Sequence, residues 1–286
     1  MEFITNPIEW WIDPFRESFM RDLLVVGLLL VVATSLVGTW VVLRGMTFLG
    51  DALAHGVVPG IAIAFVIGAN TTIGALLAAV AMVSGVSLIR AHSPLPEDTS
   101  IGVLFVGFLA TGVVIVSSQS SNYAGDLTRF LFGSVTGVTN DDLVRQLIAA
   151  IIAVIGVVVF HRAFLVMTFD ELQARLLGLR PRLAHAALLV LLAVTIVASF
   201  QTVGSLLVFA FLVAPPATAA MLVRSVPRVM IAAVLIGWVA VVIGLLISVH
   251  HETATGATMS LVAVVIFLLV LAAKAVTQAA TVRSTG

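Results

Sequence analysis

The chain has 286 residues, of which 61% are hydrophobic and only 10% charged, with equal numbers of acidic and basic side chains and no cysteine. A mean hydropathy of +1.21 lies far above the range of soluble domains, so the composition predicts an all-α polytopic membrane protein. The zero net charge argues against nucleic-acid binding, and without cysteine the chain has neither disulfides nor thiolate metal sites.

The chain divides into three segments. Residues 1–22 contain Trp10 and Trp11 among mixed charges, and they lack the basic start and the cleavage site of a signal peptide. We therefore expect a retained segment at the membrane surface, with a disordered tail as the alternative. Residues 23–276 form the predicted transmembrane domain, and residues 277–286 a C-terminal tail.

Nine apolar runs are long enough, or nearly long enough, to span a bilayer as helices. The connection at residues 201–204 is so short that a kink or a re-entrant turn is an alternative to a full crossing. We therefore expect eight or nine transmembrane helices. The runs are residues 23–43, 48–68, 73–89, 101–117, 147–160, 183–200, 203–223, 229–249 and 257–273.

Lysine and arginine placement predicts the orientation, because cytoplasmic loops carry an excess of both. The densest cluster lies at residues 162–182, which we place in the cytoplasm, and the sides then alternate consistently in both directions. With nine crossings the acidic N-terminus lies outside. The other predicted cytoplasmic positions are residue 44, residues 90–100, residues 224–228 and the tail with Lys274 and Arg283.

Residues 43–60 place an acid and an imidazole inside an apolar run. Asp51 and His55 are four residues apart, so in a helix they lie on one face about one turn apart, within reach of a single cation. Ionisable groups at bilayer depth are costly and usually line a pathway or bind an ion. A buried hydrogen-bonded pair that joins two helices is the alternative. Pro59 then predicts a kink or a helix break.

Residues 167–181 predict a short amphipathic helix in the cytoplasmic connection. Thr168 is the predicted cap, Asp170 and Glu171 suit the first turn, and Gly178 is a natural C-terminal stop. Its apolar stripe suits either a groove on a partner protein or a position on the membrane surface. The stripe consists of Phe169, Leu172 and Leu176.

Two consecutive prolines, Pro215 and Pro216, lie inside the seventh apolar run. They predict a helix break with a re-entrant or gating role, with a simple structural kink as the alternative. The remaining histidines His92, His161 and His185 lie at predicted membrane edges, where an interfacial role is the ordinary explanation.

Motifs for ATP hydrolysis and for intramembrane proteolysis are missing from the sequence. It contains no Gly-x-x-x-x-Gly-Lys-Ser/Thr, no His-Glu-x-x-His and no serine triad pattern. The chain is therefore not expected to be an enzyme, and energy for any transport must come from a partner.

Five segments in a fixed order resemble one known family, and the resemblance covers about residues 23–273. The chain is similar to the ABC-3 family, the permease subunits of ATP-binding-cassette importers for zinc, manganese or iron. The segments are residues 44–60, 97–102, 131–138, 169–179 and 213–219.

The resemblance implies a homodimeric or pseudodimeric pore in a bacterial inner membrane, with two cytoplasmic ATPase subunits and an external metal-binding protein. It implies that Asp51 and His55 ligate the transported metal, which is a substrate, so no permanently bound cofactor is expected. Two such pairs across a two-fold axis would supply four ligands. The site chemistry suits Zn²⁺, Mn²⁺ or Fe²⁺, and we favour Zn²⁺. The resemblance also implies an ATPase-coupling helix with Phe169, Asp170, Glu171, Leu172, Leu176, Leu177 and Gly178.

The sequence departs from the family pattern at residues 250–256, where a proline-containing turn is more usual. His250, His251 and Glu252 suit a low-affinity metal entry site, but a solvated loop is the favoured interpretation. Two other functions stay open: a self-sufficient secondary transporter or channel for divalent cations, and a membrane assembly protein with a structural Asp51 and His55 pair.

Overall fold

The computed structural model describes residues 11, 13–94, 97–119 and 138–284, and every regular element in these ranges is a helix. The predicted segment 131–138 lies almost wholly outside the described residues, as do residues 1–10 and 12 of the N-terminal segment 1–22. The elements are η1 (Asp13–Arg16), α2 (Ser18–Leu43), α3 (Thr47–Gly56), α4 (Val58–Val66), α5 (Thr71–His92), α6 (Glu97–Gln119), α8 (Asn140–Phe169), α9 (Glu171–Leu176), α10 (Pro181–Val203), α11 (Ser205–Leu222), α12 (Val226–His251) and α13 (Thr255–Ser284).

Local side-chain chemistry fixes several of these helix ends. The Asn70 side chain accepts hydrogen bonds from the backbone of Thr72 and Ile73 and so caps α5. Thr139 and Asp142 form a reciprocal capping box at the start of α8, because each side chain accepts the other residue's backbone N–H. These polar caps lie beyond the apolar runs and define where the long helices begin.

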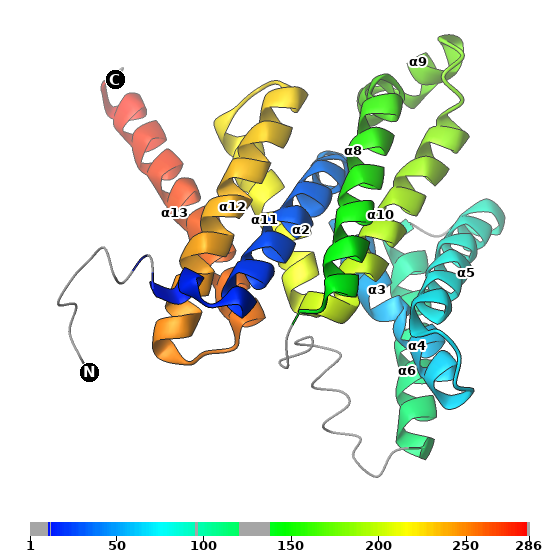
Figure 1. Ribbon diagram of the computed structural model, residues 1–286. Helices are drawn as coiled ribbons and strands as arrows, with labels where there is room; N and C mark the ends of the chain where they lie inside the picture. Colours follow the sequence, from blue (N-terminus) through cyan, green and yellow to red (C-terminus); the bar gives the residue numbers. More distant parts are fainter. Residues whose placement is uncertain (1–10, 12, 95–96, 120–137, 285–286) are drawn as a thin grey trace.

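Eight stretches among the described residues are helical, long and apolar enough to cross a membrane, with α3 and α4 counted together. Helix α11 is shorter, with 18 residues. The single residue Gly204, at φ 80°, separates it from α10, and α11 runs back to the end where α12 begins (Figure 1). The chain is thus a multi-pass membrane protein; α11 is a shorter apolar helix beside these eight stretches, and a ninth crossing there stays a prediction.

The ends of the helices gather on two sides, as the lysine and arginine pattern predicts (Figure 1). On one side, Arg44 after α2 contacts Met167 near the end of α8. On the same side, the Lys274 ammonium of α13 donates to the carbonyl of Met221 at the end of α11. These two contacts agree with the predicted alternation, and the assignment of this side to the cytoplasm stays a prediction.

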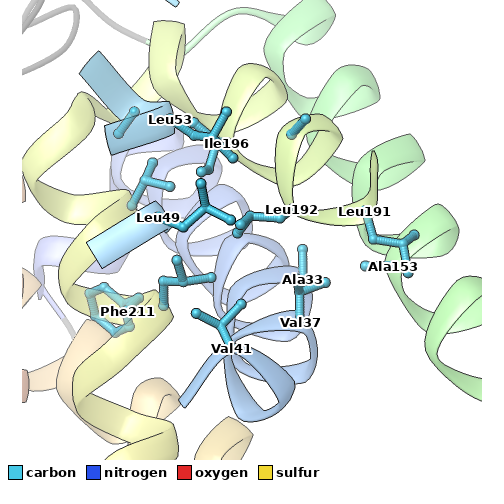
Figure 2. Packing of buried hydrophobic residues seen from close by; sticks show 14 of the residues in the cluster. Ala33, Val37, Val41, Leu49, Leu53, Ala153, Leu191, Leu192, Ile196 and Phe211 are labelled. Atoms are coloured by element: carbon cyan, nitrogen blue, oxygen red, sulfur yellow. The ribbon is translucent and has the colours of Figure 1, made fainter. Parts of the chain in front are cut away.

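The core is built around α2, which packs against α8, α10, α11 and α12. Leu30, Val37 and Trp40 of this helix are fully buried. Figure 2 shows Leu49 and Leu53 of α3 within the same core, next to Leu192 and Ile196 of α10, with Val41 of α2 and Phe211 of α11 close by. Helix α3, which carries Asp51 and His55, is therefore packed against the core through the face that bears Leu49 and Leu53.

Helices α6 and α13 lie at the periphery. Only 17% of the apolar window of each is buried, against 67% for α2. Their exposed side chains are large and hydrophobic, as a surface that faces lipid requires. Helix α13 also continues to Ser284, so most of the segment predicted as a tail extends the last helix.

The predicted break at Pro215 and Pro216 does not occur, because α11 is continuous from Ser205 to Leu222. Pro216 has no N–H to donate to the carbonyl of Leu212, four residues earlier. That carbonyl lies against Gly38 of α2, where an added methyl group would overlap it. Helix α2 thus packs closely against the carbonyl that Pro216 leaves without a helical partner, in line with the role of neighbouring helices in membrane helices that contain proline.

Candidate metal-translocation site

A tight turn connects α2 to the helix that carries the candidate ligands. Gly45 adopts φ 67°, the N–H of Gly45 donates to Val42 and the N–H of Met46 donates to Val41. This is the Schellman arrangement, in which glycine supplies the left-handed residue that ends a helix. Helix α3 begins directly afterwards, at Thr47.

Helix α3 has a buried face and a more open face. Leu49 and Leu53 are 1% and 0% exposed and belong to the core. Phe48, Asp51 and His55, at positions i, i+3 and i+7, share the opposite face, which the chain covers only in part.

The two candidate ligands are close together on that open face. His55 Nε2 lies 3.6 Å from Asp51 Oδ1, and the side chains are 22% and 32% exposed respectively. This separation is longer than a hydrogen bond, and both atoms face the same region beside the helix. The sequence prediction that a single helical turn brings these side chains together is confirmed.

An aromatic side chain from a distant helix contacts the imidazole. Phe105 of α6 lies edge-on to the His55 ring at a centroid distance of 5.8 Å, and also edge-on to Phe48 at 6.1 Å. These contacts limit the tilt of the imidazole and border the ligand pair with apolar surface. Phe48 shares the helical stripe of Asp51 and could have been found from its spacing, whereas no local signal links Phe105 to His55.

The helix containing the pair ends one residue beyond it. Helix α3 stops at Gly56, Val57 forms the turn and α4 begins at Val58, with Pro59 in its first turn. Pro59 has no N–H for the carbonyl of His55, and its backbone nitrogen lies where Gly112 of α6 leaves room. The interruption therefore directly follows the candidate ligand His55, and a gating role for Pro59 stays a prediction.

The described residues supply only part of the ligand set that a bound transition metal needs. Among the described residues there is no group of three or more histidine, aspartate or glutamate side chains placed to hold an ion. Zn²⁺ takes about four ligands and Mn²⁺ favours about six. A cation at Asp51 and His55 must therefore obtain further ligands from water or from a second molecule.

The loop residues His250, His251 and Glu252 do not form such a group either. His250 lies in the last turn of α12 with its Nδ1 2.8 Å from the carbonyl of Leu246, and Glu252 adopts a left-handed conformation after the helix. Ser248 and Thr255 are hydrogen bonded across the same turn at 2.9 Å. The turn is ordered by its own hydroxyl groups, and an entry site there stays a prediction without a preformed ligand cluster.

The short helix α9 forms where the sequence predicts it, but with a different cap. Helix α8 continues to Phe169, so Thr168 lies inside it and donates to the carbonyl of Phe164. Asp170 caps α9 by accepting the N–H of Gln173 at 2.9 Å. The prediction of Thr168 as the cap was wrong, because the apolar periodicity of α8 extends through Met167.

Helix α9 presents its apolar side chains outward. Leu172 and Leu176 are 67% and 80% exposed, and Leu177, directly after the helix, is 52% exposed. Phe169, predicted as part of this helix, is instead the last residue of α8, because α8 continues through it, and it is 75% exposed. Only Ala174 is buried. Glu171 pairs with Arg175 at 2.8 Å, and Gly178, at φ 72°, ends the helix as predicted. The stripe is therefore available to a partner.

The chain is similar in sequence to one protein family and to two named transport proteins. The profile of the ABC 3 transport family matches residues 16–274. A probable iron transport system membrane protein of Haemophilus influenzae is 35% identical over 78% of this chain and 81% of its own length. The manganese transport system membrane protein MntC of Listeria monocytogenes is 36% identical over 75% of this chain and 76% of its own.

A solved structure shows the same fold. PsaBC from Streptococcus pneumoniae, in complex with a Fab, contains a chain that matches with a TM-score of 0.82 and 30% sequence identity. The match covers 92% of this chain and 95% of that chain.

Proposed function

Because the chain belongs to the ABC 3 transport family and is a permease subunit of an ABC-type metal transporter, we propose that it moves a divalent transition metal into the cytoplasm past Asp51 and His55. ATP hydrolysis belongs to a separate subunit of such transporters, which agrees with the missing nucleotide-binding motif. The bacterial inner membrane is the proposed location.

One observation carries this proposal: a carboxylate and an imidazole lie 3.6 Å apart on a partly open face of a membrane helix. A carboxylate oxygen and a neutral imidazole nitrogen are ligands that suit first-row divalent metals. A set of two is also weak enough to release the ion, which conduction requires.

A second copy of the chain would complete the site. The face of α3 with Asp51 and His55 is only partly covered by α6, and the described residues supply no third ligand. A two-fold dimer with these faces opposed would provide two oxygens and two nitrogens. We therefore propose a homodimeric pore in which each chain contributes one pair.

The candidate substrates are Mn²⁺, Fe²⁺ and Zn²⁺. The names of the two relatives favour manganese or iron over the Zn²⁺ that the sequence analysis favoured. Oxygen and nitrogen ligands without thiolate are compatible with all three, and affinity alone does not separate them. Manganese is therefore the first substrate to test, with Zn²⁺ as the competitor.

The exposed stripe of α9 is the proposed contact with the ATPase. Leu172 and Leu176 have no partner surface in the described chain, and an apolar stripe of this kind suits a groove. An external metal-binding protein would deliver the ion on the opposite side. A self-sufficient transporter would need its own coupling-ion site, and no cluster of three acidic or histidine side chains occurs in the described ranges.

The test is ATP-dependent metal uptake into vesicles that contain this chain with its ATPase and binding protein. Asp51→Asn and His55→Ala should each abolish uptake of Mn²⁺, because each removes one of the two ligands. Complex assembly and metal-free ATPase activity should persist, since both side chains lie on the open face and not in the core.

Asp22→Asn is the matched control, because it removes a carboxylate near the start of α2, away from the pair. Normal uptake by both site variants, at equal membrane abundance, would make the pair structural. Uptake by this chain alone without ATP would instead support a self-sufficient transporter.

A further inference from the structure

Three helix ends meet at one arginine. Arg44 follows the last residue of α2, and its Nη1 lies 3.2 Å from His185 Nδ1 of α10 and 3.6 Å from the Met167 sulfur of α8. Arginine can only donate, so His185 accepts at Nδ1 and carries its proton at Nε2. All three residues are partly or fully buried.

Each of these residues borders an element that the proposed function uses. Met167 lies three residues before Asp170, the cap of α9, and is 5% exposed. His185 lies in the first turns of α10, which begins at Pro181, a short turn after α9 ends at Leu176. Arg44 lies three residues before Thr47, where the metal-site helix α3 begins. The arginine therefore joins both flanks of α9 to the start of α3.

Hydrogen bonds hold the backbone around Arg44, so a displacement of the Arg44 side chain is transmitted to α3. Its N–H donates to the carbonyl of Trp40, and the two following residues form the Schellman bonds to α2. Met46, between this turn and α3, is 8% exposed and belongs to the core. A displacement of the α8 and α10 ends would move the turn as a unit and not deform a loose loop.

We propose that Arg44 is a positioning residue that couples movement of α9 to the Asp51 and His55 helix, with His185 as the acceptor that maintains the link. The proposal rests on the proposed function, in which α9 contacts the ATPase. An ordinary structural role for Arg44, as a cation at the C-terminus of α2, is the competing explanation.

The experiment measures metal ions transported per ATP hydrolysed in vesicles with the complete complex. Arg44→Gln and His185→Phe should each lower this ratio at least about fivefold, the scale of a lost coupling interaction, while complex assembly and ATPase activity persist. The double variant should be no worse than either single one, because both remove the same contact.

His185→Asn supplies the discriminating control. The Asn Oδ1 atom stands near the position of the lost Nδ1 and can accept from Arg44, so the ratio should return toward the wild-type value. Arg182→Gln removes an exposed arginine from the same helix end and should leave the ratio unchanged.

Unchanged ratios in Arg44→Gln and His185→Phe would overturn the proposal. Equal losses in His185→Asn and His185→Phe would also overturn it, because packing and not the acceptor would then matter. If the Arg44→Gln variant does not assemble into the complex, the transport ratios of His185→Phe and His185→Asn test the proposal. Failure of wild-type uptake would instead refute the proposed function, so the two failures are distinguishable.

Discussion

Glu252 ends α12 in a left-handed conformation, with φ 49° and ψ 40°. A residue with a Cβ is strained there by roughly 1–2 kcal/mol, and glycine is the usual choice. We expect Glu252→Gly to raise the free energy of unfolding by about 1 kcal/mol, measured by thermal or denaturant unfolding in detergent. Glu252→Gln, which keeps the strain and removes the charge, should match the wild type. Equal stability of all three proteins would contradict this interpretation of the turn.

Helix α11 depends on a close contact with α2 at Gly38. An added methyl group would overlap the carbonyl of Leu212, a backbone atom that cannot rotate away. We expect Gly38→Ala to destabilise the fold by about 1–3 kcal/mol or more, visible as a lower unfolding temperature and reduced monodisperse yield. Gly107→Ala on α6 is the control, because nothing lies within 4 Å of its added Cβ and its stability should not fall. A stable Gly38→Ala protein would show that the two helices can separate without cost.

The whole molecule has its helix ends on two sides, and the absence of cysteine allows each side to be labelled specifically. Single cysteines at Trp11 and Thr253 should react with an impermeant maleimide in intact cells, whereas Leu176→Cys should react only after permeabilisation. This follows from the cytoplasmic position predicted for the arginine-rich connection and from nine passes with α11 included. Labelling of Thr253→Cys only after permeabilisation, like that of Leu176→Cys, would mean that α11 is not a crossing, because α10, α11 and α12 lie between these two positions.

Local spacing made much of this protein predictable from its sequence. Apolar runs predicted the helices, because a backbone in lipid must satisfy its own hydrogen bonds. The four-residue spacing of Asp51 and His55 fixed their common face, since helical geometry alone determines it. Gly178 predicted the end of α9 for an equally local reason, as the left-handed residue there favours glycine.

Other features were decided only by tertiary structure. Phe105 meets His55, and Arg44 meets His185 across 141 residues of sequence, so no local pattern indicates either contact. The close approach of α11 to Gly38 of α2 likewise joins residues far apart in the sequence. Sequence determines contacts that one helical turn can make, while contacts between helices depend on which faces pack together, and that is a property of the whole fold.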